Sequence, residues 1–430
     1  MVQITTSLRE KSAAERSADT AALGALVKFG PKKRRIIRTI EFFLRPAVKL
    51  IDGLKPSNSV AAPEEVREIL VIELWNLGDI VMQSPFLINL RVQYPQARIV
   101  LLTSPKIAPL IADQGLIDEI VEVRVPWAQH YSRLRKYNPF SSQWFSTFAS
   151  LRALRKRRLD LAFSARADLR DNFILWFLNI HRRVGYSFGG GGFFLTDTVV
   201  PDLRNQHFSH RWLRLLEHLD KPIRERHPRL HVAKEEHHAA GKLLESHGVR
   251  DGDFLVAVHA GARSVNRQWG EAHFAEVAER LLANFPVKII WFQDPAQQIP
   301  PPKGENVLPL ALPLKEFVAV LNHCRMFVCN DSGPMHMAAA LNVPVVAVFG
   351  PTEPAWFGPL GTHHQIVIRG GFWCRPCFDY CIFDQPYCLR AIDVQEVYQA
   401  AQNTLQALFS RPSSEKTSRE VAKVPEVQSA

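Results

Sequence analysis

Residues 326–349 read MFVCNDSGPMHMAAALNVPVVAVF, and this stretch decides the fold of the second half of the chain. Met326–Cys329 and Val343–Phe349 are short hydrophobic runs, typical of strands buried on both faces of a parallel sheet. Between them, Asp331-Ser332-Gly333-Pro334 has the residues of a helix start, and Met335–Leu341 continues as a helix. The stretch therefore predicts a strand–helix–strand unit whose two strands are parallel.

Further units of this kind lie on both sides. In the second half we expect strands at Phe254–His259 and Val287–Phe292, and helices at Glu271–Asn284 and Leu314–Asn322. The first half repeats the plan with the strand Ile69–Leu74, a turn at 75–79, the helix Ile80–Tyr94, and strands at Arg98–Leu102, Ile117–Val123 and Leu159–Ser164. The pattern predicts an α/β protein with two Rossmann-like domains facing each other across a cleft, where such sheets bind ligands. We place the domains at 67–228 and 229–409, after a partly disordered basic arm (1–66) and before a disordered tail (410–430).

Composition and charge exclude several classes of protein. The 430 residues carry a net charge of +11, which indicates a polyanionic partner. No hydrophobic run is long enough to cross a membrane, the N-terminus lacks the pattern of a secretion signal, and the six cysteines do not form a disulfide scaffold. We therefore expect a cytoplasmic monomer. The basic stretches contain no nucleic-acid-binding module, so a nucleic-acid partner is not expected.

Residues 23–54 alternate hydrophobic and basic side chains and are interrupted by Pro46. A basic amphipathic segment of this kind can lie on an anionic membrane surface. The alternative is an arm packed on the protein's own surface. The first interpretation predicts a peripheral membrane protein.

Two loops of the second domain are candidates for binding phosphate. Asp331-Ser332-Gly333-Pro334 would present backbone amides at a helix start, and the loop Ala260–Trp269 adds Gly261, Arg263 and Arg267. Taken singly, these are an ordinary capped turn and surface arginines. Both loops follow strands of one parallel sheet, so both lie at the carboxyl ends of its strands. Together they favour a diphosphate site.

In the first domain, Asp79 follows the first strand and Gly78. A carboxylate facing the cleft from this position can accept a proton from an attacking hydroxyl; a helix N-cap is the alternative. Arg166, Arg170 and Arg183 are candidates for holding phosphates or carboxylates of an acceptor.

Two further motifs concern metals. Cys374, Cys377, Cys381 and Cys388 follow the spacing C-x2-C-x3-C-x6-C, which suits structural Zn²⁺ or an iron–sulfur cluster, with a metal-free local fold as the alternative. Asp251-Gly252-Asp253 has the spacing of a metal-binding Asp-x-Asp motif, but it precedes a strand and is interpreted as a turn. No cofactor is expected for catalysis.

Several of these segments resemble glycosyltransferase family 9, the heptosyltransferases. The similar segments are LGDIVMQSP (77–85), RRVGY (182–186), HAGA (259–262), RQW (267–269), NDSGPMHMAAAL (330–341) and PVVAVFGPT (344–352). The resemblance extends over about residues 67–405. Arg267 stands where the family usually has lysine, HAGA replaces the commoner Pro-Gly-Ala, and residues 293–298 replace a glycine-rich loop beside the nucleoside.

The resemblance implies a GT-B fold and an inverting transfer from a nucleotide-diphosphate-sugar, typically ADP-heptose. It implies a lipopolysaccharide-core acceptor at the cytoplasmic face of the bacterial inner membrane. Asp79 matches the family's catalytic base, Arg267 a group that binds the donor phosphate, and Asp331 an acid that contacts the sugar. Ser332, Gly333 and Pro334 match the diphosphate-binding turn, with His336 behind it. The alternatives are another sugar-nucleotide enzyme, such as an epimerase, or a non-catalytic sugar-nucleotide-binding protein.

Overall fold

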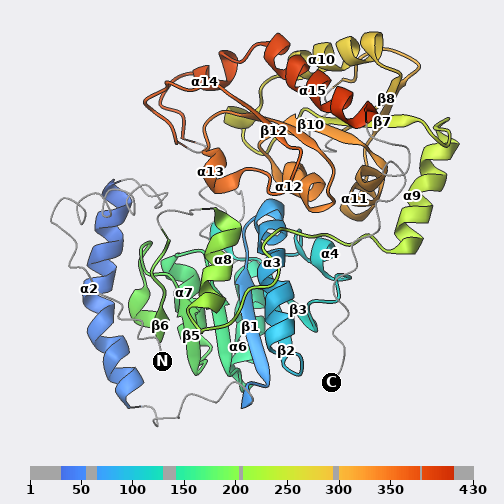
Figure 1. Cartoon of the computed structure of the whole chain (residues 1–430). Coiled ribbons are helices and arrows are strands. Elements are labelled where there is room, and N and C mark those ends of the chain that lie inside the picture. Colours follow the sequence, from blue (N-terminus) through green and yellow to red (C-terminus); the bar gives the residue numbers. More distant parts are fainter. Residues whose placement is uncertain are drawn as a thin grey trace, which may run out of the picture.

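Two six-stranded sheets, one in each half of the chain, form the framework of the molecule (Figure 1). The computed structural model describes residues 31–54, 65–128, 142–202, 207–293, 300–377 and 380–410. The strand orders are β3-β2-β1-β4-β5-β6 and β12-β11-β10-β7-β8-β9, and all of these neighbours are parallel. Read from its other edge, the second order repeats the first, so both domains are doubly wound. The predicted pair of Rossmann-like domains is confirmed.

The first domain contains the lower sheet of Figure 1 and the helices around it. Its strands are β1 (Glu68–Glu73), β2 (Arg98–Thr103), β3 (Glu119–Glu122), β4 (Leu161–Ser164), β5 (Arg182–Gly185) and β6 (Asp197–Thr198). Its helices are α2 (Pro31–Gly53), α3 (Leu77–Gln93), α4 (Ala108–Ile111), α6 (Ser142–Arg155), α7 (Leu169–Phe177) and α8 (Phe208–Glu217), with short 3₁₀ turns η2 (Pro126–Ala128) and η3 (Gly192–Phe194).

The second domain begins with α9 (Lys234–Ser246), so the predicted boundary at 228/229 lies in the connection that follows α8. Its strands are β7 (Phe254–His259), β8 (Val287–Phe292), β9 (Val307–Leu310), β10 (Met326–Asn330), β11 (Val345–Phe349) and β12 (Gln365–Ile368). The remaining helices are η4 (Val265–Arg267), α10 (Glu271–Asn284), α11 (Leu314–His323), α12 (Gly333–Ala340), α13 (Pro354–Phe357), α14 (Tyr387–Arg390) and α15 (Val394–Phe409).

Central strands were easier to predict than edge strands. The side chains of β10 and β11 are buried throughout, and this burial is why they are continuous hydrophobic runs in the sequence. The bounds of β7, β8 and α10 match their predictions residue by residue. The strands β5, β6, β9 and β12 were not predicted, because they are short and either polar or partly exposed.

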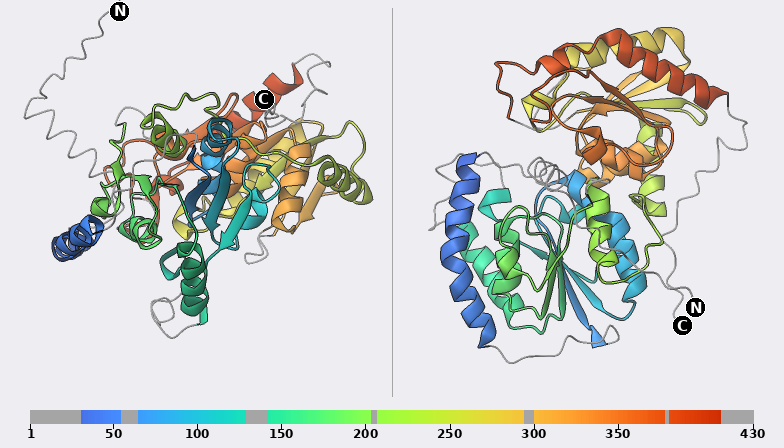
Figure 2. Two further views of the ribbon diagram at one scale, coloured as in Figure 1. Left: turned by 90° about the horizontal axis from the view of Figure 1, so that it is seen from below. Right: turned by 60° about the vertical axis from the view of Figure 1, so that its left-hand side comes forward.

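The basic segment near the N-terminus differs from its prediction in one respect. It forms the continuous helix α2 through Pro46, although proline removes one helical hydrogen bond. Figures 1 and 2 both show α2 along the flank of the first domain, where it packs against η3. The predictions for residues 1–30 and for the tail from residue 411 onward lie outside the described residues.

The topology places four loops together. In each sheet the strand order reverses at one pair of neighbours, β1 and β4 in the first domain and β7 and β10 in the second. Loops at the carboxyl ends of such strands diverge and leave a crevice. Asp79 follows β1, Arg166 follows β4, Arg263 and Arg267 follow β7, and Asp331 follows β10. All four loops therefore face the space between the domains.

Candidate functional site

A cavity of about 520 Å³ lies between the two domains, a size suited to a small ligand. It brings together eight of the residues predicted from the sequence. The first domain supplies Asp79, and the second supplies Arg263, Arg267, Asp331, Ser332, Gly333, Pro334 and His336. One cavity therefore holds the predicted base and the predicted diphosphate site.

Asp79 lies in the first turn of α3, where its buried carboxylate is held by two neighbours. Asn76 Nδ2 donates to Asp79 Oδ2 at 2.7 Å, and Arg166 Nη1 donates to the same oxygen at 2.8 Å. The guanidinium of Arg166 lies over the ring of Trp75, 4.6 Å from its centre. These contacts fix the direction of the carboxylate toward the cavity, as a general base requires.

Two further carboxyl groups are buried behind Asp79. Glu73 ends β1 and accepts a hydrogen bond from the backbone N–H of Trp75 at 3.0 Å. Burial, and after it the charge of Asp79, raises the pKa of Glu73 to about 8. Burial and the charge of Asp168 raise the pKa of Asp171 to about 7. The raised pKa favours a proton on Glu73 at neutral pH, and Asp79 is the acidic side chain that pairs with Arg166, at 2.8 Å.

On the opposite wall, Asp331 is buried and held from two sides. Arg267 Nη1 donates to Asp331 Oδ2 at 3.2 Å, and the hydroxyl of Thr352 donates to the same oxygen. The carboxylate fixes the guanidinium of Arg267 at the cavity wall. A planar cation fixed in this way can bind the oxygens of a phosphate.

The start of α12 forms the floor between these groups. Ser332 is its N-cap, and the hydroxyl of Ser332 is buried without a hydrogen-bond partner in the described parts of the chain. That hydroxyl and the positive end of the helix favour an anionic ligand. A Cβ added to Gly333 would lie 3.5 Å from the backbone nitrogen of Gly78, so the two helix starts are in close contact.

His336 packs behind this floor. A Cβ added to Gly78 would lie only 2.7 Å from His336 Cδ2, so glycine at position 78 lets α3 approach α12. Burial lowers the pKa of His336, which favours a neutral imidazole at pH 7.

Four residues of the site were not predicted from the sequence. Asn76 accepts a hydrogen bond from Arg263 across the cleft, Lys106 lines the cavity, and Glu73 and Thr352 are described above. Burial and the nearby charge of Arg263 lower the pKa of Lys106. Each of the four lies at or just after the carboxyl end of β1, β2 or β11. A search for polar residues at every strand end would have found them.

Four predicted donor- or acceptor-side residues are not in the cavity lining: Gly261, Arg166, Arg170 and Arg183. The carbonyl of Gly261 accepts a hydrogen bond from Asn330 Nδ2 at 3.4 Å. Arg170 pairs with Asp168 at 2.6 Å. Arg183 is buried, and it donates to the carbonyls of Ile180 and Phe194 and to Asp52 of α2. Arg183 therefore joins α2 to the first domain. Arg166 is the predicted acceptor-side arginine that contacts Asp79.

The four predicted metal-binding cysteines are close in space. Burial, followed by the thiols of Cys374, Cys381 and Cys388, raises the pKa of Cys377 to about 11. No group of three or more His, Cys, Asp or Glu side chains within the described ranges has the arrangement of a metal site. The four cysteines are therefore not arranged as a metal site in the described part of the chain, and a structural zinc there stays a prediction.

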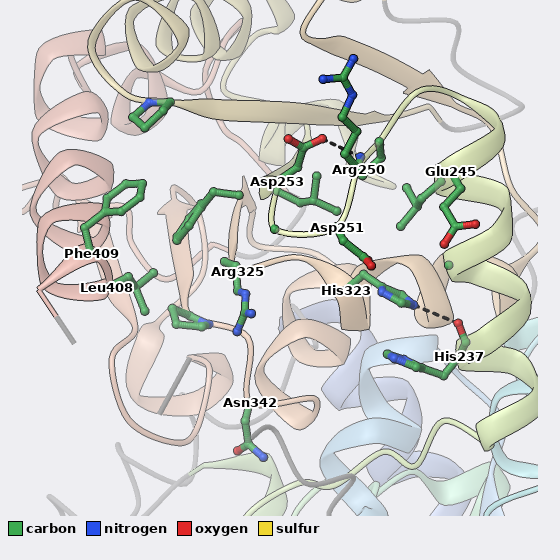
Figure 3. Close-up of a pocket in the computed structure, with 18 of the residues that line it drawn as sticks. His237, Glu245, Arg250, Asp251, Asp253, His323, Arg325, Asn342, Leu408 and Phe409 are labelled. Carbon is green, nitrogen blue, oxygen red and sulfur yellow. Dashed lines mark hydrogen bonds between the residues drawn. The ribbon is translucent and has the colours of Figure 1, made fainter. Parts of the chain in front are cut away.

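A larger cavity, of about 1160 Å³, lies at the amino-terminal ends of strands of the second sheet (Figure 3). Its lining includes Phe254 and Leu255, which begin β7, whereas the interdomain site follows the end of that strand. Asp253 pairs there with Lys288 at 2.7 Å. The motif at 251–253 is a turn, as predicted, and it is separated from the interdomain cavity by the length of the sheet.

Comparison with known proteins identifies the family. The model of glycosyltransferase family 9 (heptosyltransferase) matches residues 147–387, more than half of the chain. Lipopolysaccharide heptosyltransferase 1 of Pseudomonas aeruginosa is 32% identical over 165 residues, which span 34% of this chain and 46% of that protein. Lipopolysaccharide heptosyltransferase 2 of Salmonella typhimurium is 24% identical over 329 residues, spanning 70% of this chain and 88% of that protein.

Solved structures show the same fold. The family 9 glycosyltransferase from Veillonella parvula is 22% identical, with a TM-score of 0.63 over 81% of this chain and 100% of that one. Escherichia coli ADP-heptose lps heptosyltransferase II is also 22% identical, with a TM-score of 0.59 over 80% and 100%. These likenesses confirm the GT-B architecture, and the family match shows that the chain belongs to glycosyltransferase family 9, the heptosyltransferases.

Proposed function

We propose that this chain transfers heptose, with inversion, from ADP-heptose to a lipopolysaccharide-core or related glycolipid acceptor. One observation carries the proposal: Asp79 from the first domain faces Arg267 and the start of α12 from the second across one cavity. This is the arrangement needed to place an attacking hydroxyl and a departing diphosphate on opposite sides of a sugar.

In the proposed reaction, the acceptor hydroxyl attacks the anomeric carbon of the donor. Its proton passes to the carboxylate of Asp79, which Asn76 and Arg166 hold in place. The new bond joins the acceptor oxygen to the anomeric carbon, and the bond from that carbon to the diphosphate oxygen breaks. A single displacement from the opposite side inverts the configuration of that carbon.

The departing diphosphate gains negative charge as its bond to the sugar breaks. Arg267, Arg263 and Lys106 line the cavity as cations, and the hydroxyl of Ser332 and the start of α12 add hydrogen-bond donors. Groups already aimed at developing charge often supply the largest part of catalysis. On the acceptor side, Arg166 and Arg170 would hold acceptor phosphates. Arg183 has no such role, because it is buried and pairs with Asp52 of α2.

The sugar and the base of the donor rest on the family and on its named relatives, which include an ADP-heptose heptosyltransferase. The predicted nucleoside loop at 293–298 lies mostly outside the described residues. A lipid-linked acceptor would place the enzyme on the inner face of the bacterial inner membrane.

A donor screen tests the proposal. The protein is incubated with ADP-heptose, with ADP-glucose, and with GDP- and UDP-sugars, and its melting temperature is recorded. We expect ADP-heptose to give the largest rise, and substitution of Arg267 by Ala to abolish that rise. A larger rise with a UDP- or GDP-sugar would contradict the proposed donor.

The same proteins are then mixed with ADP-heptose and a lipopolysaccharide-core acceptor. Appearance of a heptosylated product supports transfer. Epimerised sugar nucleotide without transfer would favour the epimerase alternative, and donor binding without any product would favour a binding protein.

A further inference from the structure

The helix α2 contacts the first domain along a narrow line of side chains. Of its residues from 35 to 53, Ile37, Glu41, Val48 and Asp52 are the ones that are not exposed. Val48 is buried, and Ile37 packs on Gly190, where an added Cβ would lie 2.7 Å from Ile37 Cγ2. These four residues, which we name the seam, recur at the spacing of one helix face.

Both acids of α2 lie in the seam. Glu41 Oε1 accepts a hydrogen bond from the backbone N–H of Gly191 at 2.7 Å. Asp52 accepts one from Trp176 Nε1 at 3.0 Å and pairs with Arg183 at 3.3 Å. The helix is therefore attached to the domain by two acidic side chains as well as by Ile37 and Val48.

Outside the seam, large hydrophobic side chains of α2 are exposed. Ile36, Phe43 and Leu50 of α2 and Leu54, in the turn directly after it, follow one another at intervals of seven, seven and four residues, so they form one line along the helix. They are 58%, 70%, 67% and 79% exposed. Phe42, 75% exposed, contacts Phe43 edge to face. An ordinary surface helix has the reverse arrangement, with its hydrophobic face toward the protein.

The exposed charged side chains that the structure describes on α2 are all basic. Arg35, Arg38, Arg45 and Lys49 are all exposed, and no acid accompanies them outside the seam. A second copy of this chain is a poor partner, because pairing along the hydrophobic line would bring like charges together. An anionic lipid surface matches both features, since its headgroups attract the basic residues and its acyl boundary accepts the hydrophobic line.

We propose that α2 is a membrane-docking helix that inserts the line Ile36, Phe43, Leu50 and Leu54 into the interface of an anionic bilayer. The seam would hold the first domain against this surface. None of the described helices is long and apolar enough to cross a membrane. The proposed contact is with the surface of the bilayer. The proposal does not depend on the transferase activity.

Point substitutions test this better than deletion of α2, because deletion would leave the buried Arg183 without Asp52. The full chain is sedimented with vesicles of phosphatidylcholine alone and with equimolar phosphatidylcholine and phosphatidylglycerol. Phe43→Ser/Leu50→Ser removes hydrophobic contact, and Arg38→Gln/Arg45→Gln/Lys49→Gln removes charge. Trp373→Ser, at an exposed aromatic residue of the second domain, is the matched control.

We expect the wild type and Trp373→Ser to bind the anionic vesicles and to be released by high salt. Each α2 variant should bind at least about tenfold more weakly while keeping its melting temperature in buffer. Binding by the serine variant equal to that of the wild type would overturn the proposal, as would failure of the wild type to bind anionic vesicles at low salt. A dimer that only the serine variant loses would identify a second copy as the occupant instead.

Discussion

The carboxylate of Asp79 has more support than a helix-capping residue needs. Asn76 and Arg166 both donate to its Oδ2, and Arg263 reaches Asn76 from the other domain. The contact between Arg263 and Asn76 connects the second domain to a residue that holds the base.

Replacing Asp79 by Asn should lower kcat by at least about 10²-fold, because a general base contributes roughly 10²–10⁴-fold. Donor affinity should stay nearly unchanged, since the base acts on the acceptor. Single-turnover kinetics and calorimetric donor titration measure the two quantities. Asp251→Asn, at the opposite, amino-terminal end of the strands, is the control and should keep full activity. Retention of more than about a tenth of wild-type kcat in Asp79→Asn would remove Asp79 as the base.

Glu73 should make stability depend on pH. Its pKa rises from 4.5 to about 8 on folding, so the folded protein keeps a proton that the unfolded chain loses. Stability attributable to this group is therefore present below about pH 4.5 and is lost as the pH rises toward 8. Glu73→Gln keeps the shape without the ionisation, so it should lose less melting temperature between pH 5 and pH 8 than the wild type.

We expect a gap of at least about 2 °C between the two proteins at pH 8, the shift produced by roughly 1 kcal/mol. Glu122→Gln, at an exposed glutamate, is the control and should behave like the wild type. Parallel pH profiles for wild type and Glu73→Gln would show that Glu73 ionises normally.

Between elements, α3 of the first domain and α12 of the second are in close contact at the site. Gly78→Ala would place a Cβ 2.7 Å from His336 Cδ2, so the side chain or the helix must move. Overpacking of this kind costs about 1–3 kcal/mol, and we expect a lower melting temperature and weaker donor binding.

A double-mutant cycle tests the cause. Gly78→Ala should cost less in a His336→Ala background, because the clashing ring is absent. Gly370→Ala, where an added Cβ meets nothing, should be neutral in both backgrounds. Equal costs of Gly78→Ala with and without His336 would mean that the glycine is needed for another reason.

Helices and strands were predicted best from the sequence where their side chains are completely buried. The hydrophobic runs of β1, β7 and β10 and the turn before α12 were recognisable because tertiary packing and local sequence agree there. The role of Arg183 was not recognisable, since its partners Ile180, Phe194 and Asp52 come together only through the packing of α2 and η3. Pairs such as Arg263 with Asn76 depend on the relative position of the domains, which periodicity does not specify.

For the whole molecule, the cavity charge predicts how turnover responds to chelators. Lys106, Arg263 and Arg267 line the cavity proposed for the donor diphosphate, and the Asp-x-Asp motif lies at the opposite, amino-terminal end of the strands. We therefore expect turnover to survive excess EDTA. Activity that is lost to chelator and restored by Mg²⁺ or Mn²⁺ would contradict this. Loss of a metal from the cysteine loop would be seen separately, as a fall in melting temperature.

The central claim is that Asp79 and the facing phosphate site transfer heptose from ADP-heptose by a single displacement. The most direct measurement is nuclear magnetic resonance of the heptosylated acceptor formed by the wild type, with Asp79→Asn run beside it. We expect a product whose anomeric configuration is opposite to that of the donor, and almost none with Asp79→Asn. A product with retained configuration, or equal product from Asp79→Asn, would contradict it.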